Sequence, residues 1–293
     1  MPAIENQSAT QTPSTPKGPS KRGLVKRLLS NPRTSIAGVV FIGLILIALI
    51  GPMLNPIDYR AQVGIPLTNE GLLGTDDFGR DVFARLLVAT RTSVLVALSA
   101  VLIAMIIGVT LGLIAGFIGG LPSTIIMRGS DILLSFPAII LAIAVVAILG
   151  PDLINVVIVI GVLYVPQFTR VVYAQAASIR QAQFVDAERV NGTRTINIIA
   201  FTVLPNVLSP IIVQGSLSTS FAVQVEAGLS FLGLGAQPPL ASLGTLIASG
   251  RDFLEVQPSL LLYPAAVLVA IVLTVNVLGD GLRDVLDPRR SFK

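Results

Sequence analysis

The feature that most constrains this chain is a series of long segments without charge. Seven stretches of 17 or more residues contain no Asp, Glu, Lys or Arg: 34–57, 92–127, 132–151, 153–169, 195–225, 227–250 and 256–279. A helix needs roughly 20 apolar residues to cross the ~30 Å hydrocarbon core of a bilayer. Charged residues make up only 12% of the chain, whereas soluble domains carry about 25%. We therefore expect an integral membrane protein.

The stretch 227–250 differs from the other six because it is rich in residues that break helices. It contains Gly228, Gly233, Gly235, Pro238, Pro239, Gly244 and Gly250. Such a composition argues against a regular helix. The remaining stretches predict an all-α fold with six transmembrane helices at about 35–54, 93–118, 130–149, 153–173, 206–226 and 258–279. Pro137 and Pro166 are expected to kink the helices that contain them.

The basic residues predict how the chain lies in the membrane. Six spans place both ends on one side, and Lys and Arg are enriched in cytoplasmic segments. With a cytoplasmic N-terminus, fifteen of them fall inside and five outside. The inner set is Lys17, Lys21, Arg22, Lys26, Arg27, Arg33, Arg128, Arg170, Arg180, Arg189, Arg194, Arg283, Arg289, Arg290 and Lys293; the outer set is Arg60, Arg80, Arg85, Arg91 and Arg251. This favours cytoplasmic N- and C-termini.

The chain divides into a tail and one membrane domain. Residues 1–33 combine a Pro-, Ser- and Thr-rich segment with a basic run and predict a disordered cytoplasmic tail without a cleavable signal peptide. Residues 34–290 form the transmembrane domain. Within it, residues 55–92 are expected outside the cell and residues 174–205 form an inner loop.

Several chemistries are excluded by residues that the chain lacks. It has no Cys and no His, which removes disulfides, Ser-His-Asp triads and His-ligated metals. No lysine lies between Lys26 and Lys293, so the Gly-Lys-Ser/Thr of a phosphate-binding loop is missing. The basic residues flank spans instead of forming a nucleic-acid patch. We expect no catalytic residue, no metal ligand, no cofactor and no nucleic-acid partner in this chain.

The inner loop carries the most informative pattern. A short helix over Gln181–Val190, a break at Gly192 and a second helix over Thr193–Thr202 are expected, with Pro205 at the start of span five. A helix–glycine–helix elbow beside the membrane could dock into a cleft on a cytoplasmic partner.

This loop resembles the cytoplasmic signature of permease subunits of bacterial ABC importers, Glu-Ala-Ala-x3-Gly-x9-Ile-x-Leu-Pro. The matching residues are Asp186, Ala187, Glu188, Gly192, Thr202, Leu204 and Pro205. Glu188 and Thr202 depart from the small residue and the isoleucine of that signature. The resemblance implies that Asp186, Ala187, Glu188, Gly192, Leu204 and Pro205 form the loop that couples to an ATPase.

Three further motifs resemble the dipeptide, oligopeptide and nickel group of these permeases, and its second, C-type subunit in particular. They occupy residues 73–81, 229–239 and 276–288, and the resemblance covers about 24–290. It implies the type I ABC importer architecture in a bacterial or archaeal plasma membrane. The implied partners are a homologous permease, two ATPase subunits that hold ATP and Mg, an extracytoplasmic substrate-binding protein and membrane lipid.

Glu226 is a candidate for a gate or for the substrate path, together with Ser230 and Gln167. Counted from Asn206, Glu226 lies about 30 Å along span five, near the outer boundary. An acid within a span suggests function, but at the boundary it can also anchor the Gly-rich turn that follows. Both interpretations stay open.

Other charged and small residues predict contacts. Arg128 and Asp131 are spaced for an (i, i+3) ion pair, with contact to a partner subunit as the alternative. The cluster Asp76, Asp77 and Asp81 is expected to cap the outer loop and dock the binding protein in preference to holding a metal. Glu188 is expected to pair with a cation, either on the ATPase or at Arg189 or Arg194. Gly108, Gly112 and Gly116 predict close helix packing, with spans two to five facing the partner permease.

The function that these features favour is uptake of di- or oligopeptides by an ATP-driven importer. Nickel, glutathione or another small solute is the alternative cargo, and the lack of His, Cys or clustered midplane acids favours peptides over nickel. An ATP-independent secondary transporter would need buried carboxylates near the midplane. A membrane hydrolase would need a nucleophile pair or paired acids, and the sequence offers neither.

Overall fold

The computed structural model describes residues 32–286, which leaves the predicted tail up to residue 31 and residues 287–293 outside the described part. The described part is built of helices, with two isolated β-bridges in segment 55–81. The long helices are α2 (Pro32–Leu54), α3 (Val82–Leu113), α6 (Leu153–Arg180), α9 (Leu204–Phe231) and α11 (Ser259–Leu286). The shorter ones are η1 (Ile114–Ile118), α4 (Gly120–Leu134), α5 (Ala138–Leu149), α7 (Gln183–Val190), α8 (Thr195–Asn197), η2 (Ile198–Val203) and α10 (Leu243–Arg251).

The all-α membrane architecture is confirmed. Five helices in the described residues are long and apolar enough to cross a bilayer, and α4 with α5 makes a sixth crossing if this bent pair counts as one span. The described chain thus accommodates the six predicted spans. Within α6, Pro166 lies inside a helix that continues on both sides of it.

The third span is not the continuous helix expected over 130–149. It consists of α4 and α5, which meet at a bend of 87°. Pro137 lacks an N–H and restricts the residue before it, so the helix ends at Leu134 and restarts at Ala138. The proline predicted to kink this span therefore breaks it.

Two other boundaries differ from the prediction. Span two begins at Val82 instead of 93, because Asp81 caps the helix and Arg85 finds a carboxylate partner at that end. The stretch 227–250 was not expected to be helical, yet its first residues complete α9 and its last part forms α10. Ser242 begins α10 with a capping box, in which its hydroxyl and that of Thr245 bond to each other's backbone N–H.

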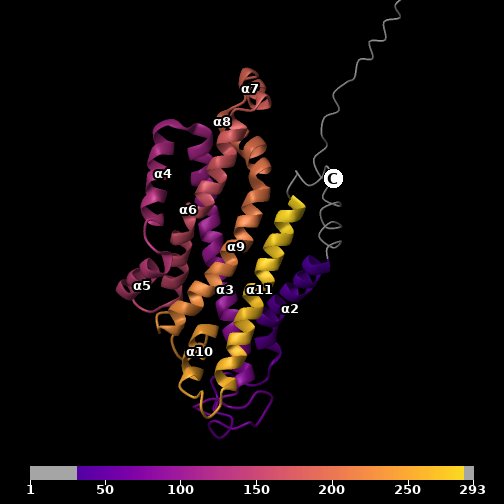
Figure 1. The fold of residues 1–293 in the computed structure, drawn as a ribbon, viewed down its shortest axis with the longest axis vertical. Coiled ribbons are helices and arrows are strands. Elements are labelled where there is room, and N and C mark those ends of the chain that lie inside the picture. The colour runs from indigo at the N-terminus through magenta and orange to yellow at the C-terminus, as the bar shows by residue number, and fades with distance from the viewer. Residues whose placement is uncertain (1–31, 287–293) are drawn as a thin grey trace, which may run out of the picture.

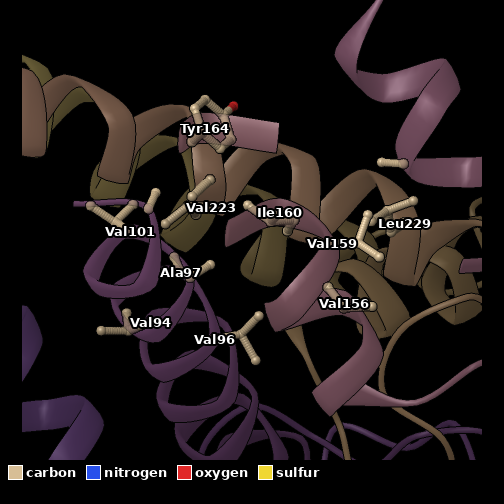
Figure 2. Packing of buried hydrophobic residues seen from close by; sticks show 14 of the residues in the cluster. Val94, Val96, Ala97, Val101, Val156, Val159, Ile160, Tyr164, Val223 and Leu229 are labelled. Atoms are coloured by element: carbon tan, nitrogen blue, oxygen red, sulfur yellow. The ribbon is translucent and has the colours of Figure 1, made fainter. Parts of the chain in front are cut away.

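The helices form a bundle with distinct ends (Figure 1). One end carries α7, and we call it the elbow end. The opposite end carries segment 55–81 and α10, and we call it the loop end. The bent pair α4–α5 flanks α6 on one side of the bundle, and α2 packs against α11 and α3 on the other. Figure 2 shows the buried core, where valine, isoleucine and alanine side chains of α3, α6 and α9 meet.

Helix α3 and the following η1 pack extensively against α6, and three spaced glycines explain why: Gly108 and Gly112 on α3 and Gly116 on η1. A Cβ added at Gly108 would lie 2.6 Å from the Cβ of Phe168, and one added at Gly112 would lie 2.7 Å from the Cβ of Val172. A Cβ added at Gly116 would lie 2.8 Å from the Cβ of Ala176. The predicted close packing is therefore present, but it joins two helices of this chain and does not face a partner permease.

Candidate functional site

The elbow, which we define as residues 183–203, is anchored to the bundle by a small apolar cluster. Val185 on α7 and Ile198 and Val203 on η2 are buried with Val172, Ala176 and Phe117. The Arg189 guanidinium lies 5.4 Å from the centre of the Phe117 ring. One face of α7 is thereby held against η1 and η2, while the opposite face remains exposed.

The turn after α7 depends on the backbone conformation of Gly192. Its φ is +77°, and a Cβ added there would meet no atom within 4 Å. The Gly192 N–H donates to the Arg189 carbonyl and the Thr193 N–H donates to the Glu188 carbonyl, which is the Schellman pattern of a helix end. Gly192 is needed for its left-handed conformation and not for space.

The two residues that depart from the signature contact each other. The Thr202 hydroxyl on η2 donates to the Glu188 carboxylate at 2.8 Å. Among the described residues, the local cations Arg189 and Arg194 do not pair with Glu188, and a hydroxyl of the same chain bonds to it; a cation on the ATPase stays a prediction. Arg189 instead pairs with Asp186, at 3.1 Å.

The second half of the elbow is not a separate helix over Thr193–Thr202. The segment from Thr195 runs through α8 and η2 directly into α9 as one rod. η2 is a π-helix, and the Leu204 N–H bonds to the Ile199 carbonyl five residues back. This wider winding accommodates Pro205, which cannot donate a backbone hydrogen bond. Leu204 and Pro205 form the first turn of α9, as predicted for Pro205 at the start of span five, and this turn continues the winding of α8 and η2.

The elbow exposes large apolar side chains beyond what its own packing uses. Phe184, Val190, Ile196 and Phe201 are at least half exposed, and Val190 reaches 87%. Asp186, Ala187 and Pro205 are exposed beside them. An apolar surface ringed by charge at the tip of a membrane helix pair is typical of a docking site.

The loop end is organised around Asp76. Its Oδ1 accepts the backbone N–H groups of Phe78 and Arg80, and its Oδ2 accepts Arg80 Nε at 2.8 Å and Arg85 Nη1. Asp76 and Arg85 are both buried. This network closes segment 55–81 onto the first turn of α3.

The neighbouring acids have structural partners as well. Asp81 caps α3 by accepting the Ala84 N–H at 2.6 Å, as the loop-capping interpretation predicted. Burial, followed by the charge of Asp76, raises the pKa of Asp77 above the usual value of an aspartate. No group of three His, Cys, Asp or Glu side chains is arranged for a metal ion in residues 32–286.

Glu226 is completely buried where α9, α10 and α3 meet. Its Oε1 accepts the Ser230 hydroxyl at 2.7 Å, while its Oε2 has no hydrogen-bond partner in the described chain. The Ser93 hydroxyl on α3 accepts the Leu243 N–H at the start of α10. Glu226 and Ser230 thus lie inside the chain, beside the junction that fixes α10.

Gln167 lies in a different setting, on a partly exposed face of α6. Its Oε1 accepts Gln214 Nε2 of α9 at 3.1 Å, and Gln214 also donates to the Ser218 hydroxyl. One turn away, Arg170 pairs with Asp131 of α4 at 2.5 Å, while Arg128 approaches Asp131 only to 4.0 Å. The expected (i, i+3) pair is thus the weaker contact. The sequence did not identify Arg170 and Gln214 as residues that join helices. Its only signal was the charge of Arg170, which ends the uncharged stretch 153–169.

Comparison with known proteins matches almost the whole chain. Residues 108–292 match the family of binding-protein-dependent transport system inner membrane components, and residues 22–69 match the N-terminal TM domain of oligopeptide transport permease C. The dipeptide transport system permease protein DppC of Alkalihalophilus pseudofirmus is 41% identical over 92% of this chain and 90% of its own length.

Two other relatives are similar over nearly the same region. The di/tripeptide transport system permease protein DppC of Pseudomonas aeruginosa is 39% identical over 87% of this chain and 88% of its own. The glutathione transport system permease protein GsiD of Pectobacterium atrosepticum is 38% identical over 90% and 89%. This chain therefore belongs to the family of binding-protein-dependent transport system inner membrane components, as a non-catalytic permease subunit of an ABC importer.

Proposed function

We propose that this chain is the membrane permease of an ATP-driven importer of di- or oligopeptides. Relatives named for dipeptide and di/tripeptide transport, at 38 to 41% identity, support this cargo. Glutathione, itself a peptide, is the cargo named for another relative, and it stands as the alternative within the same machinery. The observation that carries the proposal is the exposed elbow at one end of a membrane bundle, opposite a densely bonded loop end.

The elbow end faces the cytoplasm in this proposal, with N- and C-termini on that side of a bacterial or archaeal plasma membrane. The exposed face of α7, with Asp186 and Ala187, enters a cleft on an ATPase subunit. The turn at Gly192 and the Glu188–Thr202 hydrogen bond hold α7 at a set angle to the rod that contains Leu204 and Pro205. Closure of two ATPase subunits on ATP and Mg would then move α6 and α9 together.

The other partners follow from the two remaining surfaces. The loop end receives the extracytoplasmic substrate-binding protein, and a homologous permease completes the translocation path. Gln167 faces that path, because it is partly exposed on a membrane helix and bonded to a second amide. Glu226 and Ser230 are assigned to holding α10 in place, because burial within the chain keeps them from any substrate.

Reconstitution of the four kinds of subunit in lipid vesicles tests this function. Uptake of a labelled dipeptide should require ATP, Mg and the binding protein, and it should stop when either permease is omitted. Uptake by this chain alone along an ion gradient would contradict the proposal and indicate a secondary transporter. Uptake of glutathione or nickel without dipeptide uptake would contradict the cargo.

A further inference from the structure

A stripe of polar side chains crosses three membrane helices near the elbow end. Arg170 and Gln167 lie three residues apart on one face of α6. Asp131 meets this face from α4 and Gln214 meets it from α9, and Gln214 also donates to the buried Ser218 one turn further along α9. We call these five residues the polar stripe. The proposed function uses Gln167 alone and leaves the remaining four without a role.

The position of the stripe shows that it is not merely the charged end of a helix. Arg170 precedes the last residue of α6 by about ten residues, or roughly 15 Å. Gln167 lies a further turn from the elbow end. Asp131 is similarly about 16 Å from the start of α4. Ionisable side chains at such positions are rare on lipid-facing surfaces and typically line a path or a protein contact.

The stripe also remains accessible in this chain and keeps free bonding capacity. The Arg170 and Asp131 side chains are 48% and 43% exposed although they pair with each other. Gln167 Nε2 and Gln214 Oε1 make no hydrogen bond within residues 32–286. An exposed ion pair contributes little stability, so a ligand that carries both charges can replace it.

We propose that the polar stripe is a subsite that binds the backbone and the charged ends of a peptide during passage, an inference that rests on the proposed function. The Arg170 guanidinium suits a terminal carboxylate, and the Asp131 carboxylate suits a terminal ammonium group. The free amide groups of Gln167 and Gln214 match backbone C=O and N–H groups. Such a subsite recognises a zwitterionic dipeptide through groups that all dipeptides share, and it makes no contact that selects side chains.

Uptake kinetics of the complete transporter in vesicles, with dialanine as the probe, test this subsite. Arg170→Gln should lower the maximal uptake rate about tenfold or more, because the charge that pairs with the terminal carboxylate of the peptide is lost. The KM should stay unchanged, since the binding protein captures the peptide first. Arg128→Gln is the matched control, because Arg128 faces the same carboxylate but is 79% exposed and 4.0 Å away. It should stay within about twofold of wild type.

A charge exchange separates ligand binding from a structural ion pair. Arg170→Asp combined with Asp131→Arg restores the pair within the chain but reverses the charges offered to the peptide. The subsite predicts that uptake stays low while assembly and ATP hydrolysis are normal. Full recovery of uptake in the double variant, or equal rates for Arg170→Gln and Arg128→Gln, would overturn it.

Chemical labelling gives a readout that does not depend on peptide uptake. Because the chain contains no cysteine, Gln167→Cys creates a single thiol. A water-soluble thiol reagent should label it in the assembled transporter, and it should leave Val39→Cys on the exposed face of α2 unlabelled in lipid. A lack of labelling at position 167 would overturn the subsite. If Gln167→Cys is labelled but the wild-type transporter takes up no dialanine, the proposed cargo and the peptide subsite are both wrong. The labelling would then show only that position 167 is accessible to water.

Discussion

The two ends of the bundle are stabilised in different ways. At the loop end, charged and polar groups are buried and bonded to each other: Asp76 binds Arg80 and Arg85, and Ser230 binds Glu226. At the elbow end, polar contacts such as Glu188–Thr202 and Asp186–Arg189 are partly or fully exposed, and large apolar side chains face outward. Removing a buried charge partner is costly, whereas exposed contacts contribute little.

This difference suggests a division of work within the permease. The loop end forms a rigid cap on α3, α9 and α10, suited to receive a partner without changing shape. The polar contacts of the elbow end are more exposed, and Phe184 and Val190 face outward, so we expect a partner to cover them. Between the ends, the glycine contacts of α3 with α6 provide a stiff connection. Four predictions test this view, from the largest expected effect to the smallest.

The loop end should collapse when its central acid is removed. Asp76→Ala leaves Arg85 buried without its carboxylate, which should lower the free energy of unfolding by about 3–5 kcal/mol. Thermal unfolding of the purified complex in detergent measures this loss. Asp252→Ala at the same end breaks an exposed pair with Arg251 and should change stability by less than about 1 kcal/mol. Equal melting temperatures for the two variants would refute the rigid cap.

The connection between the ends should fail when α3 can no longer approach α6. Gly112→Leu places a side chain where even a Cβ would lie 2.8 Å from the Thr169 carbonyl oxygen, so we expect a loss of about 1–3 kcal/mol and less assembled complex. Gly43→Leu on α2 is the control, since a Cβ there meets nothing within 4 Å. The amount of folded permease in membranes is the measurement. Normal amounts for Gly112→Leu would mean that the two helices can separate without cost.

The elbow should lose coupling, but not its fold, when the turn conformation is changed. Gly192→Val forces a β-branched residue to a φ of +77°, a strain of about 1–3 kcal/mol that α7 can relieve by moving. ATP hydrolysis should persist while the substrate transported per ATP falls severalfold. Gly192→Asn should behave like wild type, because asparagine tolerates this conformation. If the valine and asparagine variants transport the same amount of substrate per ATP, the angle of α7 has no effect on the coupling of ATP hydrolysis to transport.

The smallest effect is expected for the hydrogen bond inside the elbow. Glu188→Ala and Thr202→Val each remove one partner of a partly exposed hydrogen bond, which contributes about 0.5–1 kcal/mol or less to the stability of the elbow. Each variant should therefore lower the substrate transported per ATP only slightly. The double variant should be no worse than either single one, since the bond is lost only once. Transport at equal membrane abundance measures all three. Additive losses would show that Glu188 contacts the ATPase instead of Thr202.

The sequence by itself determined the helical class and the approximate position of five spans, because uncharged stretches near 20 residues admit few other structures. It also located the elbow and its Gly192 turn, because a left-handed position favours glycine whatever surrounds it. These features depend on local composition and on backbone preferences, which neighbours along the chain set.

Only the tertiary structure decided which residues pair across helices. It showed that Glu188 meets Thr202, that Asp131 meets Arg170 more closely than Arg128, and that the α3 glycines face α6. It also turned the break at Pro137 into an 87° bend. Contacts of this kind depend on helix rotation and depth, because a residue's angular position on a helix leaves open which neighbour it will touch.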